Sequence, residues 1–189
     1  SSTQMGKNVT NFEKKISKLF SKKYGLMVNS GSSALMLAME TLNFPKGSEI
    51  ITPALTFSTT VGYIVRNNWI PVFVDVEEGT YCINESKIRK LINKKTKAIV
   101  APHLMGNLVN WKKLAPMLKK KGILILEDSA DTLGATFQNK SSGHYADISI
   151  TSFYGSHIIN CAGNGGMVCF NEKKKYIKAK LLRSWGRSS

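Results

Sequence analysis

The feature that most constrains the fold of this chain is a regular alternation of short apolar strands with helical segments. Helices that connect parallel strands cover the faces of the resulting sheet, and such crossovers are right-handed. The 189 residues therefore predict one α/β domain with a largely parallel sheet. Strands are expected at residues 26–29, 50–52, 69–76, 97–102, 123–126, 148–153 and 167–170, and helices at 34–42, 57–67, 84–92, 110–121 and 172–185.

The first helix is expected from a local signal near the N-terminus. Residues 10–13 (TNFE) match a capping box, a pattern that marks the start of a helix. Phe12, Ile16, Leu19 and Phe20 then fall on one helical face, which we expect to be buried.

Composition also indicates where some elements lie. The helix at residues 34–42 carries almost no charge and is expected to be buried, and the all-apolar strand 123–126 is typical of strands covered on both faces. Pro71 indicates an edge or strand-start position because proline cannot donate to a sheet ladder. Residues 138–143 are polar and predict a loop.

The chain is strongly basic, with 27 Lys+Arg against 12 Asp+Glu and a net charge of +15. A basic surface attracts polyanions, so nucleic acid is one class of partner to consider. The lysines are mostly spread over expected helix exteriors, however, and no RNP-like, zinc-finger or helix-turn-helix pattern accompanies them. We interpret them as solvated faces, compatible with a small anionic substrate, and expect no nucleic-acid partner.

Other sequence features concern membranes and redox state. No run of eighteen apolar residues occurs, and residues 1–6 lack the apolar core of a signal peptide, so we expect a cytoplasmic protein with no membrane partner. Cys82, Cys161 and Cys169 are odd in number and lack CxxC spacing. They are expected to be reduced thiols rather than disulfides or metal ligands, and no metal site is expected.

Small and polar residues follow several expected strands, at the sheet edge where parallel α/β proteins bind ligands. Residues 30–33 (SGSS) lie between a strand and a helix, which places backbone N–H groups at a helix N-terminus and predicts an anion site. A plain N-cap serine would explain the same run. Asp128 follows an apolar strand and predicts a buried carboxylate that needs a cationic or hydrogen-bonding partner, unless it caps a helix.

A third stretch combines a hydroxyl, an imidazole and small residues. Ser152 ends an apolar strand, His157 follows five residues later, and residues 162–166 (AGNGG) allow close backbone approach. The hydroxyl can hold a phosphate and the imidazole can move a proton. His103 also ends a strand and can approach this edge, whereas His144 is expected on the surface.

Together these stretches resemble the DegT/DnrJ/StrS family of sugar-nucleotide aminotransferases and dehydratases, which have the aspartate aminotransferase fold and use pyridoxal phosphate. The matches occur in family order and span nearly the whole chain. They are residues 29–34 (NSGSSA), 52–57 (TPALTF), 71–76 (PVFVDV), 127–130 (EDSA), 133–135 (LGA), 152–154 (SFY) and 165–168 (GGMV).

The resemblance implies a fold and a domain organisation. It implies the three-layer α/β/α large domain of a fold-type-I pyridoxal-phosphate enzyme, with a mostly parallel mixed sheet. Residues 1–189 would be this cofactor-binding domain, followed in a longer protein by a smaller C-terminal domain.

The resemblance also implies which residues bind the cofactor. Ser32 and Ser33 would hold the cofactor phosphate at the helix N-terminus, and Ser152 would add a hydroxyl. Phe57 would stack on the pyridine ring, and Asp128 would pair with the ring nitrogen and keep it protonated. The cofactor-binding residues implied in this way are Gly31, Ser32, Ser33, Phe57, Asp128, Asp131 and Ser152.

Two positions depart from the pattern of most relatives. Asp131 stands where many have a glutamine near the phenolic oxygen of the cofactor. His157 stands five residues after Ser152, where the aminotransferases have the lysine that binds the cofactor covalently. An imidazole cannot form that link, but it exchanges a proton near neutral pH.

The histidine resembles the branch of the family that removes the C3 hydroxyl of 4-keto-6-deoxy sugar nucleotides with pyridoxamine phosphate. The resemblance implies that His157 is the proton-abstracting base, that glutamate or a similar compound donates the amino group, and that the protein is a homodimer. It places the reaction in deoxysugar and lipopolysaccharide biosynthesis. Residues outside this chain are expected to select the nucleotide and the hexose.

Other functions remain open at this point. The chain would be an aminotransferase if a lysine elsewhere bound the cofactor, and Lys140 and Lys173 are the nearest to His157 on either side. A lysine replaced by mutagenesis would give the same sequence. A non-catalytic regulator would have little need for Asp128, Phe57 and Ser152 together. DNA binding rests on net charge alone and is the weakest reading.

Overall fold

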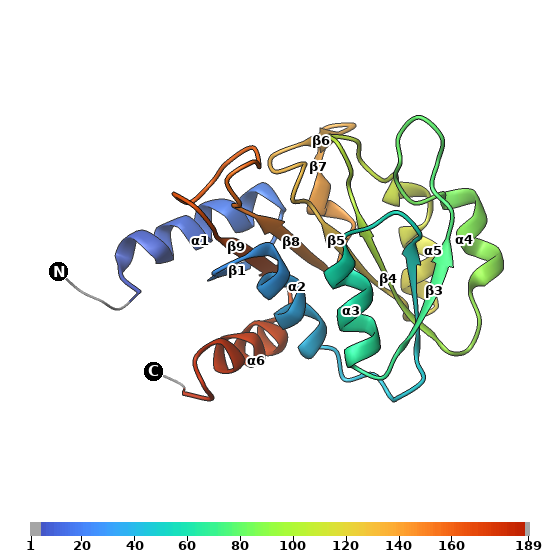
Figure 1. The fold of residues 1–189 in the computed structure, drawn as a ribbon, viewed down its shortest axis with the longest axis horizontal. Coiled ribbons are helices and arrows are strands. Elements are labelled where there is room, and N and C mark those ends of the chain that lie inside the picture. Colours follow the sequence, from blue (N-terminus) through green and yellow to red (C-terminus); the bar gives the residue numbers. More distant parts are fainter. Residues whose placement is uncertain (1–4, 188–189) are drawn as a thin grey trace.

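A mixed seven-stranded sheet forms the centre of the protein in the computed structural model, which describes residues 5–187. The strand order is β1-β9-β8-β5-β4-β2-β3, and every neighbouring pair is parallel except those that include β9. The predicted fold class is therefore confirmed (Figure 1). The strands are β1 (Tyr24–Val28), β2 (Glu49–Pro53), β3 (Ile70–Val74), β4 (Thr96–Pro102), β5 (Leu124–Asp128), β8 (Ile148–Ser152) and β9 (Gly166–Phe170).

Helices cover both faces of the sheet and give three layers. On one face, α2, α3 and α6 contribute to a core that includes Ile50 and Leu126, and on the other face α4 and α5 pack over Ile51 and Ile125. Adjacent strand residues thus enter opposite cores, which explains why the central strands are apolar throughout. The helices are α1 (Lys7–Leu19), α2 (Gly31–Glu40), α3 (Ser58–Arg66), α4 (Glu85–Leu91), α5 (Ala115–Lys120) and α6 (Lys173–Arg183).

The sequence placed some elements correctly and others not. β3 lies at one edge of the sheet, as Pro71 predicts. The helix expected at 110–121 is instead a short 3-10 turn, η1 (Trp111–Lys113), followed by α5. The loop expected at 138–143 instead includes β7 (Lys140–Ser141), which pairs with the preceding β6 (Thr136–Phe137) in a small hairpin, and it runs into the 3-10 turn η2 (Ser142–His144). These segments are too short to carry a periodic signal.

The predicted capping box is wrong. α1 begins at Lys7, one turn earlier, and its N-cap Gly6 has no side-chain cap. The Glu13 carboxylate does not fold back on the helix, because it accepts hydrogen bonds from the Met27 amide and from Arg183. The predicted capping interaction of Glu13 is therefore replaced by hydrogen bonds to residues distant in the sequence. Leu19, expected on the buried face, is 42% exposed.

None of the helices within residues 5–187 is both long enough and apolar enough to span a bilayer. The described cysteines Cys82, Cys161 and Cys169 are all free thiols.

We expect Gly166→Ala to destabilise the protein, because a Cβ at this position would lie 2.2 Å from the Ser30 carbonyl oxygen. Overpacking against backbone typically costs about 1–3 kcal/mol. Urea unfolding measures the loss. Gly62→Ala, on an open face of α3 with nothing within 4 Å of the new Cβ, is the matched control and should raise stability by up to about 1 kcal/mol. Equal stability of the two variants would contradict this account.

Candidate active site

A cavity of about 770 Å³ opens at the carboxyl ends of β4, β5 and β8, beside the N-terminus of α2. This is the sheet edge at which parallel α/β proteins bind ligands. Strands far apart in sequence converge here, and they bring together all the site residues predicted from the sequence except Ser33. Those that line the cavity are Gly31, Ser32, Phe57, Asp128, Asp131, Ser152 and His157.

One end of the cavity is formed by the first turn of α2. Ser30 is the N-cap, and its Oγ accepts a hydrogen bond from the Ser33 amide at 3.1 Å. The Ser33 hydroxyl also contacts Ser30, so Ser33 is engaged in the cap and does not line the cavity. The amides of Gly31 and Ser32 have no acceptor within the helix because they belong to its first turn. The run therefore forms a serine cap and also leaves helix-end amides free, while anion binding at this point stays a prediction.

The end of β8 presses directly against this first turn. A Cβ at Gly31 would lie 2.7 Å from the Ser152 Cβ, so only glycine allows the approach. The approach brings the Ser152 hydroxyl beside the free end of α2, and on the other side Ser32 contacts the Thr59 hydroxyl at 3.4 Å. Hydroxyls and free amides at a helix N-terminus suit a phosphate. Thr59 was not identified from the sequence because no local pattern links it to α2.

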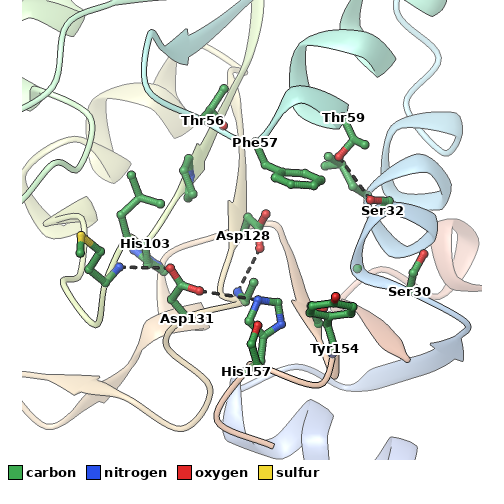
Figure 2. Close-up of a pocket in the computed structure, with 18 of the residues that line it drawn as sticks. Ser30, Ser32, Thr56, Phe57, Thr59, His103, Asp128, Asp131, Tyr154 and His157 are labelled. Carbon is green, nitrogen blue, oxygen red and sulfur yellow. Dashed lines mark hydrogen bonds and ion pairs between the residues drawn. The ribbon is translucent and has the colours of Figure 1, made fainter. Parts of the chain in front are cut away.

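Aromatic side chains stand over the middle of the cavity. Phe57 is 64% exposed, although it is large and apolar, and it faces the cavity together with Tyr154 and Asp128 (Figure 2). An exposed ring at the wall of a cavity offers a face to a planar ligand. Tyr154, two residues after Ser152, was not predicted as a site residue, although its position in the SFY motif could have indicated it.

The Asp128 carboxylate lies in an environment that disfavours its charge. Burial is the main reason that its pKa rises to about 6, and the neighbouring Asp131 carboxylate adds to the rise. The Ala130 amide donates a hydrogen bond to Asp128 Oδ1 at 3.0 Å, which opposes this rise in pKa. A cation in the cavity would favour the charged form. The protonated ring nitrogen of pyridoxal or pyridoxamine phosphate is such a cation, so phosphate end, ring face and carboxylate together fit this cofactor.

His157 and Asp131 face each other across the floor of the cavity. His157 Nε2 lies 3.8 Å from Asp131 Oδ1, and Asp131 Oδ2 accepts a hydrogen bond from the Met105 amide at 3.2 Å. Tyr154 meets the His157 ring edge-on, with centroids 6.0 Å apart. The two departures from the family pattern are therefore neighbours in space (Figure 2).

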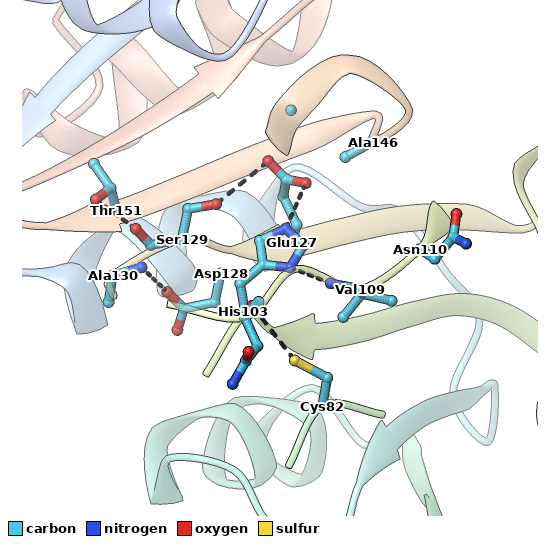
Figure 3. Close-up of polar contacts among 12 residues, drawn as sticks. Cys82, His103, Val109, Asn110, Glu127, Asp128, Ser129, Ala130, Ala146 and Thr151 are labelled. Atoms are coloured by element: carbon cyan, nitrogen blue, oxygen red, sulfur yellow. Dashed lines mark hydrogen bonds and ion pairs between the residues drawn. The ribbon is translucent and has the colours of Figure 1, made fainter. Parts of the chain in front are cut away.

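The second imidazole at the cavity, His103, has both ring nitrogens engaged. Nδ1 accepts a hydrogen bond from the Val109 amide at 3.0 Å, which leaves the ring proton on Nε2, 3.1 Å from Glu127 Oε2 (Figure 3). His103 is 1% exposed and Glu127 is fully buried. His103 can therefore wall the cavity but cannot readily exchange a proton, and His157 is the imidazole available for that role. His144 is exposed and lies outside the cavity, as expected.

The charge of the buried Glu127 carboxylate is balanced by a buried lysine, Lys22. Lys22 is 4% exposed, and its ammonium donates to the carbonyls of Gly143 and Ala146. Burial lowers the pKa of Lys22, and the charge of Glu127 opposes that fall. The interpretation of the lysines as solvated faces is therefore wrong for Lys22, and Glu127 was not identified as a site residue from the sequence. Within residues 5–187 no group of His, Cys, Asp or Glu side chains has the arrangement of a metal site.

The model of the DegT/DnrJ/EryC1/StrS aminotransferase family matches residues 1–189. Similar curated proteins include the dTDP-4-dehydro-2,6-dideoxy-D-glucose 3-dehydratase of Saccharopolyspora spinosa, 35% identical over 190 residues, and the lipopolysaccharide biosynthesis protein RfbH of Salmonella typhimurium, 39% identical over 186 residues. The alignments cover 96% and 93% of this chain but only 41% and 42% of those proteins. The chain thus spans less than half the length of these relatives.

A similar solved structure is that of an E. coli GDP-4-keto-6-deoxy-D-mannose-3-dehydratase with bound hydrated PLP. It superposes with a TM-score of 0.87 at 32% identity and covers 95% of this chain and 47% of that one. At this level of identity the likeness extends beyond the general fold to the sequence.

Asp128→Asn is expected to stabilise the cofactor-free protein at pH 7.5. Because its pKa lies near 6 in the folded state and near 3.8 in the unfolded state, wild-type stability falls as pH rises through this interval, whereas the amide has no such dependence. The variant should gain up to about 3 kcal/mol over wild type above pH 6 and little below pH 4.

Urea unfolding from pH 4 to 8 measures the difference. Asp75→Asn is the control, because the exposed Asp75 has its pKa lowered by Lys87 and should show no gain. A variant at Asp128 that is less stable than wild type at pH 7.5 would refute the electrostatic account.

Proposed function

The chain belongs to the DegT/DnrJ/EryC1/StrS aminotransferase family, and from this premise we propose that it carries the catalytic site of a sugar-nucleotide 3-dehydratase. The reaction is the pyridoxamine-phosphate-dependent loss of the C3 hydroxyl from a 4-keto-6-deoxy sugar nucleotide. One observation supports this choice above all. His157 faces the cavity after β8, and among the described residues that line the cavity there is no lysine.

The cofactor site is proposed from the geometry of the cavity. The amides of Gly31 and Ser32 and the hydroxyl of Ser152 would hold the phosphate, Phe57 would cover one ring face, and Asp128 would pair with the ring nitrogen. Pyridoxamine phosphate would supply an amine that condenses with the 4-keto group and a ring that accepts electrons. Ser33 was expected to bind the phosphate directly, but its hydrogen bonds to Ser30 favour an indirect role in fixing the helix end.

The proton-transfer role is assigned to Nε2 of His157. This atom faces both the cavity and Asp131, whereas Nδ1 is buried without a hydrogen-bond partner. When Nε2 takes a proton, the resulting imidazolium lies opposite the Asp131 carboxylate, which stabilises the positive charge. A glutamine at position 131 would lack this charge. Asp131 therefore suits a histidine base better than it suits contact with the phenolic oxygen of the cofactor.

Substrate class and setting follow from the relatives. Those named above act on 4-keto sugar nucleotides or take part in lipopolysaccharide synthesis, which supports a nucleotide-linked 4-keto-6-deoxyhexose here. The net charge of +15 suits a dianionic diphosphate. The proposal includes glutamate as the amino donor, a homodimer, and a cytoplasmic reaction, for which the free thiols are suitable.

An aminotransferase is the alternative function. It requires a lysine that reaches the cofactor, yet Lys140 and Lys173 are both exposed and neither lines the cavity. Borohydride reduction of the full-length protein with pyridoxal phosphate, followed by intact mass measurement, separates the two functions. We expect no covalent cofactor adduct. A stoichiometric adduct at one lysine would reject the dehydratase and establish the alternative.

His157→Asn is expected to abolish dehydration while retaining the cofactor. Removing a general base typically costs about 10²- to 10⁴-fold in rate. We expect kcat for C3 dehydration to fall by this order and pyridoxamine phosphate affinity to change little, because the phosphate and ring-nitrogen contacts remain. His144→Asn, which alters an exposed histidine outside the cavity, is the matched control. Substantial turnover by the variant at His157 would exclude it as the base.

A further inference from the structure

Two loops at the mouth of the cavity contain residues in an unfavourable backbone conformation. Residues 75–84 follow β3 and residues 103–109 follow β4. Tyr81 of the first loop and Met105 of the second both line the cavity. Both residues have positive φ, 59° for Tyr81 and 53° for Met105. Side chains with a Cβ rarely adopt this conformation, and where they do the surrounding structure must hold them there.

Met105 belongs to a tight turn. The Asn107 amide donates to the Leu104 carbonyl at 2.8 Å, and the two central residues, Met105 and Gly106, both have positive φ, as in a type I′ turn. Glycine suits such a turn, but methionine at its first central position does not. The turn therefore needs contacts beyond its own hydrogen bond to keep Met105 in place.

Asn107 provides those contacts from both its side chain and its backbone. Its Nδ2 donates to the Thr80 carbonyl at 3.2 Å, and its carbonyl accepts from the Cys82 thiol at 3.4 Å. Both partners belong to the loop after β3. Asn107 thus links the two loops, and its two partners, Thr80 and Cys82, lie on either side of Tyr81 in the sequence.

The same turn also orients the Asp131 carboxylate inside the cavity. The Met105 amide donates to Asp131 Oδ2, and the other oxygen of the same carboxylate faces His157 Nε2 (Figure 2). The orientation of the Asp131 carboxylate therefore depends on where the Met105 amide points. If the turn relaxes to negative φ at Met105, that amide rotates away from Asp131.

We propose that Asn107 is a positioning residue of this site: by tying residues 103–109 to residues 75–84, it holds the strained turn whose Met105 amide sets Asp131 opposite His157. The inference rests on the proposed function of His157, and it assigns Asn107 no contact with the substrate or the cofactor. Its effect on the reaction passes through Met105 and Asp131 alone.

Asn107→Ala in the full-length protein removes the bond to Thr80 and is expected to lower kcat for dehydration. Loss of one net hydrogen bond predicts a fall of about 5- to 10-fold, with pyridoxamine phosphate affinity unchanged. Asn67→Ala is the matched control, because it removes an asparagine-to-carbonyl hydrogen bond of 2.9 Å at the end of α3, away from the cavity. A control that loses as much kcat as the variant at Asn107 would overturn the inference.

A double-mutant cycle shows whether Asn107 acts through Asp131. In the Asp131→Ala background, Asn107→Ala should change kcat by less than about two-fold, because the acceptor that the turn positions is gone. In the Met105→Gly background the effect of Asn107→Ala should also shrink, since glycine adopts positive φ without strain. Full, additive losses in both backgrounds would reduce Asn107 to a structural residue and reject the proposal.

Hydrogen exchange tests the same link without any activity measurement. The Met105 amide is bonded to Asp131, so it should exchange slowly in wild type and faster in Asn107→Ala, while the Asn67→Ala protein keeps the wild-type rate. Unchanged exchange at Met105 overturns the inference whatever the activity. If exchange accelerates but the wild-type protein does not dehydrate the sugar nucleotide, the positioning link stands and the proposed function fails.

Discussion

The close approach of α2 to the ends of β8 and β9 is the contact on which the rest of the site depends. Gly166 brings β9 against the Ser30 carbonyl, and Gly31 brings the helix start against Ser152, at distances that no Cβ would permit. Because the two glycines permit this approach, free helix-end amides and a strand-end hydroxyl lie close together. The packing of the sheet therefore creates a geometry that suits an anion, with no lysine or arginine among the described residues that line the cavity.

Two adjacent carboxylates on β5 have different surroundings: one has buried partners within the protein, and the other lies at the cavity. Glu127 and Asp128 point to opposite faces of the sheet because strand side chains alternate. Glu127 is fully buried and is matched by His103 and by the charge of Lys22, whereas Asp128 receives one amide hydrogen bond and a neighbouring like charge. The protein thus satisfies the first carboxylate internally and leaves the second in surroundings that disfavour its charge. A cation bound beside Asp128 would favour the charged form and would recover the stability lost there.

The side of the cavity that carries His157 and Asp131 depends on a different kind of constraint. His157 and Asp131 come from loops after β8 and β5, and Asp131 is oriented by an amide from a loop after β4. A left-handed residue such as Met105 costs about 1–2 kcal/mol, which is close to the net value of the single hydrogen bond that closes its turn. By itself, such a turn has nearly the same free energy in the strained and relaxed conformations. One additional hydrogen bond from Asn107 is therefore sufficient to favour the strained conformation.

The sequence by itself determined the order and type of the main elements, because apolar periodicity and the residues that end helices and strands are local properties. It also identified Gly31, Ser32, Phe57, Asp128, Ser152 and His157 as residues of one sheet edge, since each lies at or shortly after the end of an expected strand, whereas Asp131 was indicated only by the family resemblance. It did not show the hairpin at 136–141, whose strands are too short to carry a pattern, or the start of α1, where Glu13 has distant partners.

Only the tertiary structure decided that Ser33 turns to Ser30 and that His103 has no free nitrogen. The same holds for the juxtaposition of Asp131 with His157. The physical reason is that a hydrogen bond or an ion pair joins atoms close in space, whereas His103 and Glu127 lie 24 residues apart along the chain, and Asp131 and His157 are likewise distant in sequence.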